Sequence, residues 1–94
     1  MTETFWHVRL SRKADRGLGE LPNPVRDALA LLLADIEEKG PVRGDWPNYG
    51  KLGPKRHHCH LRKGRPTYVA VWRETAIGFE VEVIYAGTHG KAPY

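Results

Sequence analysis

The chain has 94 residues, of which 40% are hydrophobic and 28% are charged, and its formal net charge is +4. This length supports one hydrophobic core, so we expect a single globular domain over residues 1–94. The composition excludes a disordered chain, and no stretch reaches the roughly 20 apolar residues that a membrane helix needs. The one cysteine excludes an internal disulfide. Together with the lack of a signal-peptide pattern, it predicts a cytoplasmic protein.

The first half of the sequence predicts one strand and two helices. Thr4 to Leu10 alternate between apolar and polar side chains, as in a half-buried strand. Ser11 is a suitable N-cap for a short helical turn over residues 12–16. A longer helix begins at Asn23-Pro24, with Asn23 as its N-cap, and ends at Gly40-Pro41. Its apolar residues recur at helical spacing and form one stripe: Val25, Ala28, Leu29, Leu32 and Ile36.

The second half predicts a long loop followed by three strands. Residues 42–54 are interrupted by proline and glycine, which is typical of a surface loop. Strands over residues 56–63, 67–74 and 79–86 are joined by short links and therefore form an antiparallel meander. The strand 67–74 is apolar on both faces, which indicates a central position in the sheet. In the last strand we expect these side chains to face the core: Phe79, Val81, Val83 and Tyr85.

These elements predict an α+β fold. The order is a strand, two helices and a three-stranded antiparallel meander. We expect the helices to pack on one face of a four-stranded sheet.

The most distinctive segment is the predicted basic strand with its flanks, residues 51–65, which contain lysine, arginine and histidine but no acid. Strand alternation places Arg56, His58, His60 and Arg62 on one face, and His57, Cys59 and Leu61 on the other. The first face combines fixed cations with imidazoles that titrate near neutral pH, so it suits a polyanion and could move protons. A nucleic-acid partner is the first hypothesis, and a solvated basic loop is the alternative. We expect His57 to be a buried structural residue.

A zinc site is a rival interpretation of the same segment, because histidine and cysteine are both zinc ligands. Alternation, however, turns Cys59 away from His58 and His60, and no CxxC or HExxH motif accompanies them. The surrounding cations would also oppose a divalent ion. We therefore expect neither a metal nor another cofactor.

The element order carries two local signatures, Lys51-Leu52-Gly53 before the basic strand and Gly87-Thr88-His89 after the last strand. With them the chain resembles the RelE/ParE superfamily of bacterial toxins, and most of all the RelE-type mRNA interferases of type II toxin–antitoxin systems. The resemblance extends from Phe5 to Tyr94 and implies a RelE-like fold.

The resemblance also implies an activity and a set of partners. The activity is a ribosome-dependent mRNA endonuclease that inhibits translation and works without a metal. The ribose 2′-OH attacks the adjacent phosphate and leaves a cyclic phosphate and a free 5′-OH. The implied partners are a cognate antitoxin protein, in a toxin–antitoxin hetero-oligomer, and the ribosome with its mRNA. No membrane is involved.

The resemblance assigns the catalytic residues. His58, His60 and Arg62 match the basic positions of the second strand of RelE-type toxins, and His89 matches an arginine or histidine that follows the last strand. Tyr94 matches a tyrosine close behind it. We expect His58 or His60 to be the base and His89 the acid. Tyr94 would stack on the substrate or orient it.

The remaining cations are expected to contact RNA. They are Lys51, Lys55, Arg56, Lys63, Arg65 and Arg73. One position departs from the family pattern, because many RelE-type toxins have an arginine where this chain has Val69. We expect Arg62, with Arg65 or Arg73, to hold the phosphate instead.

Two other functions stay open. One is that of the ParE type, which inhibits DNA gyrase by protein contact, and the other is a basic RNA-binding module without catalysis. The fold cannot decide between them, because one fold hosts several activities. The histidine-rich strand, with His89 and Tyr94, favours the nuclease.

Overall fold

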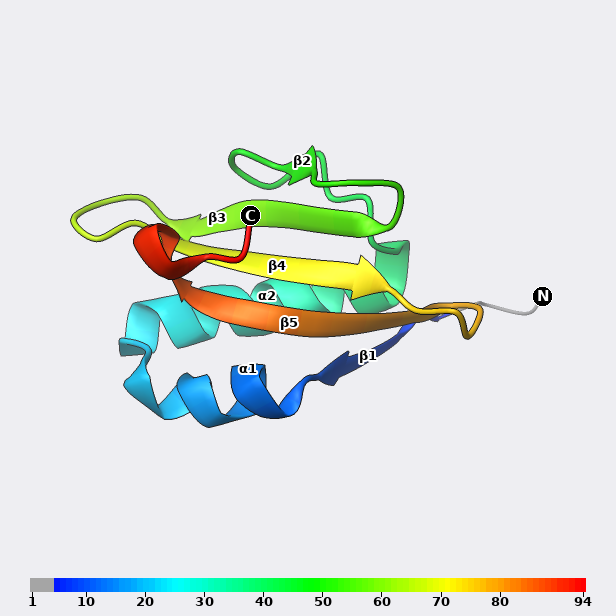
Figure 1. The fold of residues 1–94 in the computed structure, drawn as a ribbon, viewed down its shortest axis with the longest axis horizontal. Coiled ribbons are helices and arrows are strands. Elements are labelled where there is room, and N and C mark those ends of the chain that lie inside the picture. Colours follow the sequence, from blue (N-terminus) through cyan, green and yellow to red (C-terminus); the bar gives the residue numbers. More distant parts are fainter. Residues whose placement is uncertain (1–4) are drawn as a thin grey trace.

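The computed structural model describes residues 5–94, which form two α-helices, two 3-10 helices and one five-stranded sheet (Figure 1). The elements are, in chain order, β1 (His7–Leu10), α1 (Arg12–Gly17), η1 (Leu18–Glu20), α2 (Asn23–Lys39), β2 (Gly50–Lys51), β3 (Arg56–Arg62), β4 (Tyr68–Glu74), β5 (Glu80–Thr88) and η2 (His89–Lys91). Thr4, where we expected the first strand to begin, lies outside the described residues.

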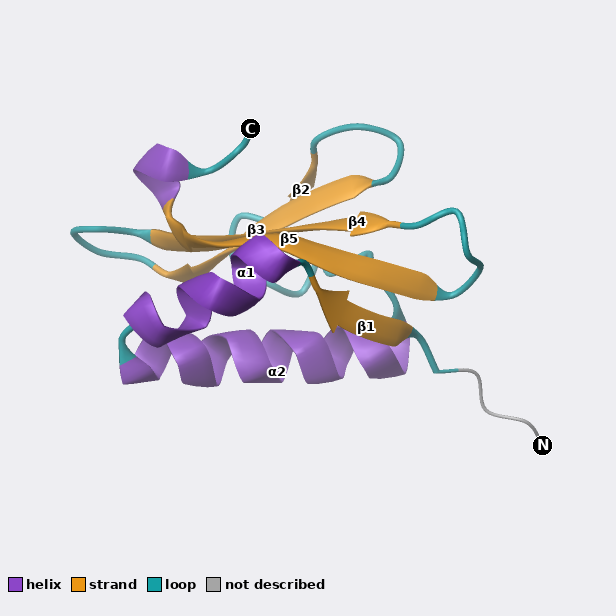
Figure 2. Cartoon of the chain, turned by 60° about the horizontal axis from the view of Figure 1, so that its bottom comes forward, coloured by secondary structure: helices purple, strands orange, loops and turns teal. Residues whose placement is uncertain are grey.

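The strands follow the order β1-β5-β4-β3-β2, so β4 is central, as predicted. The pairs β5–β4, β4–β3 and β3–β2 are antiparallel, whereas β1 runs parallel to β5. Figure 2 shows both α-helices on one face of the sheet and the C-terminal segment on the other. The predicted α+β architecture is confirmed. We call the sheet face away from the helices the open face.

The predicted strand number was one too low. Gly50 and Lys51, which lie in the predicted loop, form the edge strand β2. This strand pairs with His58 and His57 of β3. A two-residue strand is too short to show a periodic pattern in the sequence, so it can be recognised only by its pairing with a neighbouring strand.

The helix α2 covers the sheet with the predicted apolar stripe. Val25, Leu32 and Ile36 are fully buried, and the neighbouring stripe residues are buried or half-buried. The helix ends at Gly40, whose φ of 95° favours glycine. At the other end Asn23 is not the N-cap: it is already helical, and Pro22 occupies that position without a side-chain hydrogen bond.

The short helix α1 begins as predicted. The Ser11 hydroxyl accepts a hydrogen bond from the Ala14 backbone N–H at 3.1 Å. This bond satisfies one of the free donors of the first turn. Ala14 is buried and joins the core under the sheet.

A register shift between β4 and β5 changes which side chains face the core. Val71 pairs with Tyr85, but the next residue, Trp72, pairs with Val83. Because directly paired residues share a face, Tyr85 lies on the open face with Val71, and Ala86 belongs to the helix-side core. The inward prediction for Tyr85 was wrong. It was also wrong for Phe79, which is exposed and precedes β5.

Candidate active site

The alternation predicted for β3 is confirmed up to Leu61. His57, Cys59 and Leu61 are buried, while Arg56, His58 and His60 are half-exposed. His57 is fully buried: its Nδ1 lies 2.7 Å from the Tyr49 hydroxyl, and its Nε2 lies 2.9 Å from Glu74 Oε2. Its position confirms that it is a buried structural residue.

Four predicted catalytic residues meet on the open face, and we call them the histidine cluster: His58, His60, His89 and Tyr94. The ring centroids of His58 and Tyr94 are 5.2 Å apart, as are those of His89 and Tyr94. The His60 and His89 centroids are 6.0 Å apart. Residues from β3, from η2 and from the chain's last position therefore form one continuous surface.

The start of η2 positions His89. Its backbone N–H donates to the Thr67 carbonyl oxygen at 2.8 Å, which ties η2 to the residue before β4. From there the chain turns back across β4 toward β3, as Figure 1 shows. This return brings Tyr94 to His58.

His60 and His89 line a shallow pocket together with Pro66, Thr67 and Gly90. His58 does not line it. A second, more enclosed pocket between α1 and the end of β5 is lined by none of the predicted catalytic residues. The shallow pocket therefore exposes two of the three histidines of the cluster, His60 and His89.

His58 is packed between two neighbours. A Cβ added to Gly50 would lie 2.9 Å from His58 Nε2, so the imidazole rests directly on the Gly50 backbone. The other ring nitrogen, Nδ1, is buried and has no hydrogen-bond partner among residues 5–94. Tyr94 contacts the same ring. In this arrangement Nδ1 of His58 is buried, and Nε2 lies beside the Gly50 backbone.

The surroundings of His58 and His60 lower the pKa of both imidazoles. Burial, and then the nearby His60 and His89, lower the pKa of His58 below 6.5. Burial, and then His89 and Lys63, lower the pKa of His60 in the same way. A histidine with a lowered pKa is unprotonated at neutral pH and is therefore suited to accept a proton. Burial raises the pKa of Tyr94, so its hydroxyl keeps its proton.

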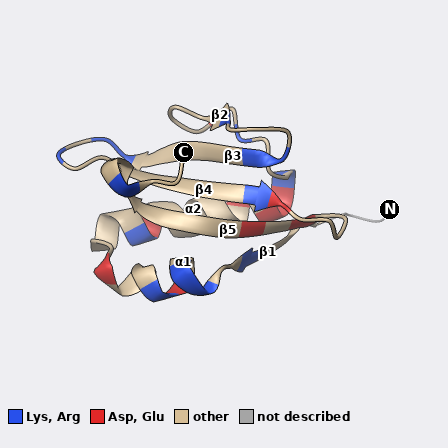
Figure 3. Ribbon diagram, in the orientation of Figure 1, with Lys and Arg blue, Asp and Glu red and all other residues tan. Residues whose placement is uncertain are grey.

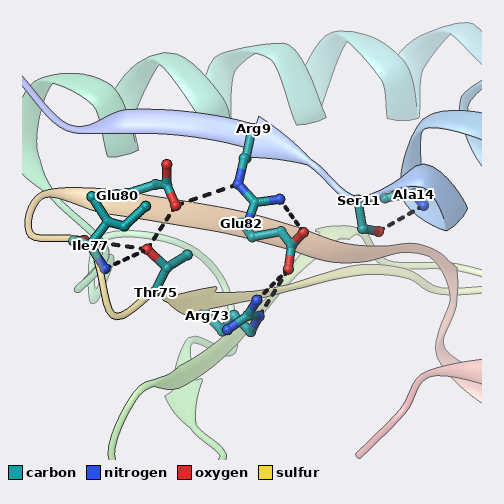
Figure 4. A network of polar contacts seen from close by, with 8 residues as sticks. All are labelled: Arg9, Ser11, Ala14, Arg73, Thr75, Ile77, Glu80 and Glu82. Carbon is teal, nitrogen blue, oxygen red and sulfur yellow. Dashed lines mark hydrogen bonds and ion pairs between the residues drawn. The ribbon is translucent and has the colours of Figure 1, made fainter.

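Two predicted RNA contacts are engaged within the protein. Arg56 Nη2 donates to the Pro93 carbonyl oxygen at 2.9 Å. Arg73 donates to Glu82 Oε1 through Nε at 2.9 Å and is also ion-paired with that oxygen through Nη2 at 2.8 Å. Figure 4 shows that Glu82 also binds Arg9 on β1. The charge of Arg73 is thus offset by a carboxylate that two arginines share.

Arg62 does not continue the histidine face. A register shift lies between His60 and Arg62, so Arg62 pairs with Tyr68 instead of extending the row of His60 and Val69. Tyr68 packs against the helix-side core. Arg62 itself is exposed at the end of β3. The predicted common face of Arg62 with His58 and His60 was wrong.

The other predicted cations lie at the surface. Lys51, Lys55, Lys63 and Arg65 are exposed, on β2 and in the loops that flank β3. Figure 3 shows lysine and arginine at the start of β3 and in the loop between β3 and β4, and acidic residues on the first part of β5. The lysine and arginine residues of β3 and its flanking loops therefore lie on the β3 side of the histidine cluster.

Within the described part of the chain, no group of three or more His, Cys, Asp or Glu side chains is arranged to hold a metal ion. Cys59 is buried on the helix side of β3, away from His58 and His60. No helix formed by residues 5–94 is long and apolar enough to cross a membrane.

No family model matches the sequence, and no curated protein matches it. Solved structures do match. One is the toxin RelE of E. coli, as a mutant with two arginines replaced by alanine, in the free state; the TM-score is 0.68 at 19% identity, over 88% of this chain and 82% of that chain. Another is the archaeal RelE–RelB complex from Pyrococcus horikoshii, with a TM-score of 0.66 at 12% identity, over 94% of this chain and 99% of that chain.

The chain has the RelE fold. At these identities the similarity establishes the fold alone. In this RelE-fold protein the open face of the sheet contains the histidine cluster, and both α-helices lie on the opposite face.

Sequence reasoning missed several residues that shape the site. Gly50 supports His58, Thr67 anchors His89, and Pro93 binds Arg56. Tyr85 covers Gly87, because a Cβ there would lie 2.7 Å from the Tyr85 hydroxyl. The glycine of Gly87-Thr88-His89 was part of a recognised signature, but its physical role needed the register of β5.

Proposed function

We propose that this protein is the toxin of a type II toxin–antitoxin system and that it cleaves mRNA as a ribosome-dependent endoribonuclease. The observation that carries the proposal is the meeting of His58, His60, His89 and Tyr94 on the open face of a RelE fold. These residues come from distant parts of the chain. Their convergence on the face away from the helix-side core supports a shared task.

His60 and His89 are the proposed acid–base pair. His60 takes the proton of the ribose 2′-OH as this oxygen forms its bond to the adjacent phosphorus. His89 gives a proton to the 5′ oxygen as the phosphorus–oxygen bond breaks, which leaves a cyclic phosphate and a free 5′-OH. His60 suits the base, because its pKa is lowered and it lines the shallow pocket. His58 is less suited, because its Nδ1 is buried and its side chain does not line the shallow pocket.

The developing negative charge needs cations near the phosphate. Lys63 is one of the groups that lower the pKa of His60, so its charge acts in the region of the proposed base. Arg62 and Arg65 are exposed on either side of Lys63 and can contribute to the same phosphate or its neighbours. Lys51 and Lys55 are proposed to contact the RNA backbone.

A cognate antitoxin is the proposed protein partner. The similar structure from Pyrococcus horikoshii is a RelE–RelB complex, which supports a partner of that kind and a toxin–antitoxin hetero-oligomer. The proposed substrate is mRNA on ribosomes, so the proposed site of action is the cytoplasm.

The test is induced expression of the wild type and of the His60→Ala/His89→Ala variant, with growth and mRNA 5′ ends followed together. His7→Ala is the matched control, because His7 is an exposed histidine on β1. We expect growth arrest with new cuts inside coding regions for the wild type and the control, and neither for the double variant. Arrest without cuts would overturn the nuclease in favour of a gyrase inhibitor of the ParE type. Absence of arrest would favour a non-catalytic RNA-binding module.

A further inference from the structure

The C-terminal segment, residues 92–94, follows η2 and is bound to the sheet through Arg56. Where it begins, the Ala92 N–H donates to the His89 carbonyl oxygen at 3.2 Å. Near its end, Arg56 Nη2 donates to the Pro93 carbonyl oxygen at 2.9 Å. Arg56 is on β3, so this bond spans from the first residue of the strand to the far end of the chain. We call residues 92–94, which lie on the open face, the strap.

The strap decides where Tyr94 lies. The Tyr94 ring is adjacent to the residue whose carbonyl Arg56 binds, and it contacts the rings of His58 and His89. Arg56 and His58 are two residues apart on β3 and share a face, so the arginine that binds Pro93 lies next to the imidazole that Tyr94 contacts. Among the described residues, the bond from Arg56 is the one hydrogen bond that joins residues 92–94 to a strand.

We propose that Arg56 is a positioning residue that holds Tyr94 against His58 and His89. We had expected Arg56 to contact RNA, but its guanidinium is half-buried and bound to a backbone carbonyl. Its Nε is buried without a hydrogen-bond partner among the described residues, so this atom is not available to a phosphate. The catalytic consequence of the strap rests on the proposed function; the strap itself does not.

The first experiment measures the strap without any RNA. The contact between the Tyr94 and His58 rings gives a proton–proton Overhauser signal that NMR can detect in the purified chain. We expect Arg56→Ala to abolish this signal and Arg56→Lys to weaken it, because lysine lacks the planar, directed donors of arginine. Arg26→Ala, which removes an exposed arginine on α2, should leave the signal intact. An unchanged signal in Arg56→Ala would overturn the proposal.

The second experiment separates positioning from RNA contact by a double-mutant cycle. We expect Arg56→Ala to lower kcat for mRNA cleavage about tenfold, the loss that one hydrogen bond to a charged group can give, with little change in KM. In a Tyr94→Ala background the same change should have no further effect, because Arg56 acts through Tyr94. Additive losses with a weaker salt dependence of binding would show a phosphate contact and refute the positioning role.

The two experiments fail in distinguishable ways. If Tyr94→Ala cleaves mRNA as well as the wild type, the proposed role of Tyr94 in catalysis fails even where the Overhauser signal behaves as expected. If the signal survives in Arg56→Ala, the strap fails whatever the cleavage rates are.

Discussion

Alanine substitution of two adjacent histidines on β3 should affect different properties of the protein, its stability in one case and the candidate site in the other. His57 is fully buried, hydrogen-bonded to Tyr49 and Glu74, and stacked on Trp72 with an angle of 8° between the rings. His58 is half-exposed on the open face and forms no hydrogen bond to the described residues through Nδ1. We therefore expect His57→Ala to destabilise the fold and His58→Ala to affect the site.

The magnitude for His57 follows from its contacts. Two hydrogen bonds contribute about 1 kcal/mol each, and removing a large buried side chain leaves a cavity that costs a further ~2 kcal/mol. The total loss in unfolding free energy is about 4 kcal/mol. In a domain of this size each kcal/mol lowers Tm by about 4–8 °C, so Tm should fall by roughly 16–32 °C. His58→Ala should change the unfolding free energy by less than about 1 kcal/mol.

Thermal unfolding of both variants, followed by circular dichroism, checks this prediction. His57→Phe is a useful companion, since it refills the volume and keeps the stacking on Trp72 while it removes both hydrogen bonds; it should recover part of the loss. If His57→Ala unfolded within about 5 °C of the wild type, the buried hydrogen bonds and stacking would not stabilise the fold as argued. If His58→Ala lost as much stability as His57→Ala, the assignment of the two faces would be wrong.

Three further predictions concern the site and the thiol. Because the pKa of His60 is lowered, cleavage should persist below pH 6.5 and decrease only on further acidification, when the imidazole binds a proton. If the cleavage rate were already decreasing with falling pH while the pH was still above 7, His60 would not be the base. Gly50→Ala should displace His58, whose Nε2 would meet the new methyl group at 2.9 Å, and weaken its ring contact with Tyr94, whereas Gly53→Ala, with open space around it, should leave the NMR spectrum of the cluster unchanged. Burial raises the pKa of Cys59 to about 12, so iodoacetamide at pH 8 should modify it in denaturant but not in the native protein, and rapid native labelling would count against its burial.

Periodic elements of this fold were predictable because each follows from local physics. The stripe of α2 and the alternation of β3 depend on spacing alone, and the Ser11 cap depends on one hydroxyl. The meeting of the histidine cluster was also anticipated, but through a family resemblance, since residues 58 and 89 are far apart in the sequence. No periodicity brings them together.

Two of the errors have a common physical cause in the pairing between strands. Tyr85 and Arg62 were misplaced because a register shift lies beside each of them, and a shift of one residue moves a side chain to the other face. The bonds of Arg56 with Pro93 and of Arg73 with Glu82 were not predicted, because these partners lie 37 and 9 residues away in the sequence. Composition shows that cations are present, whereas only the fold shows which of them are already bound.

The position of Val69 gives this arrangement a mechanistic consequence. Val69 is fully buried directly opposite His60, where many RelE-type toxins are expected to have an arginine. Arg73 is four residues farther along β4, about 13 Å away at the usual rise of a strand, and its charge is offset by Glu82. Under the proposed function, we assign the cation beside the phosphate to Lys63, in the loop after β3. A charge there serves two purposes at once, because it stabilises the developing phosphorane and keeps His60 unprotonated.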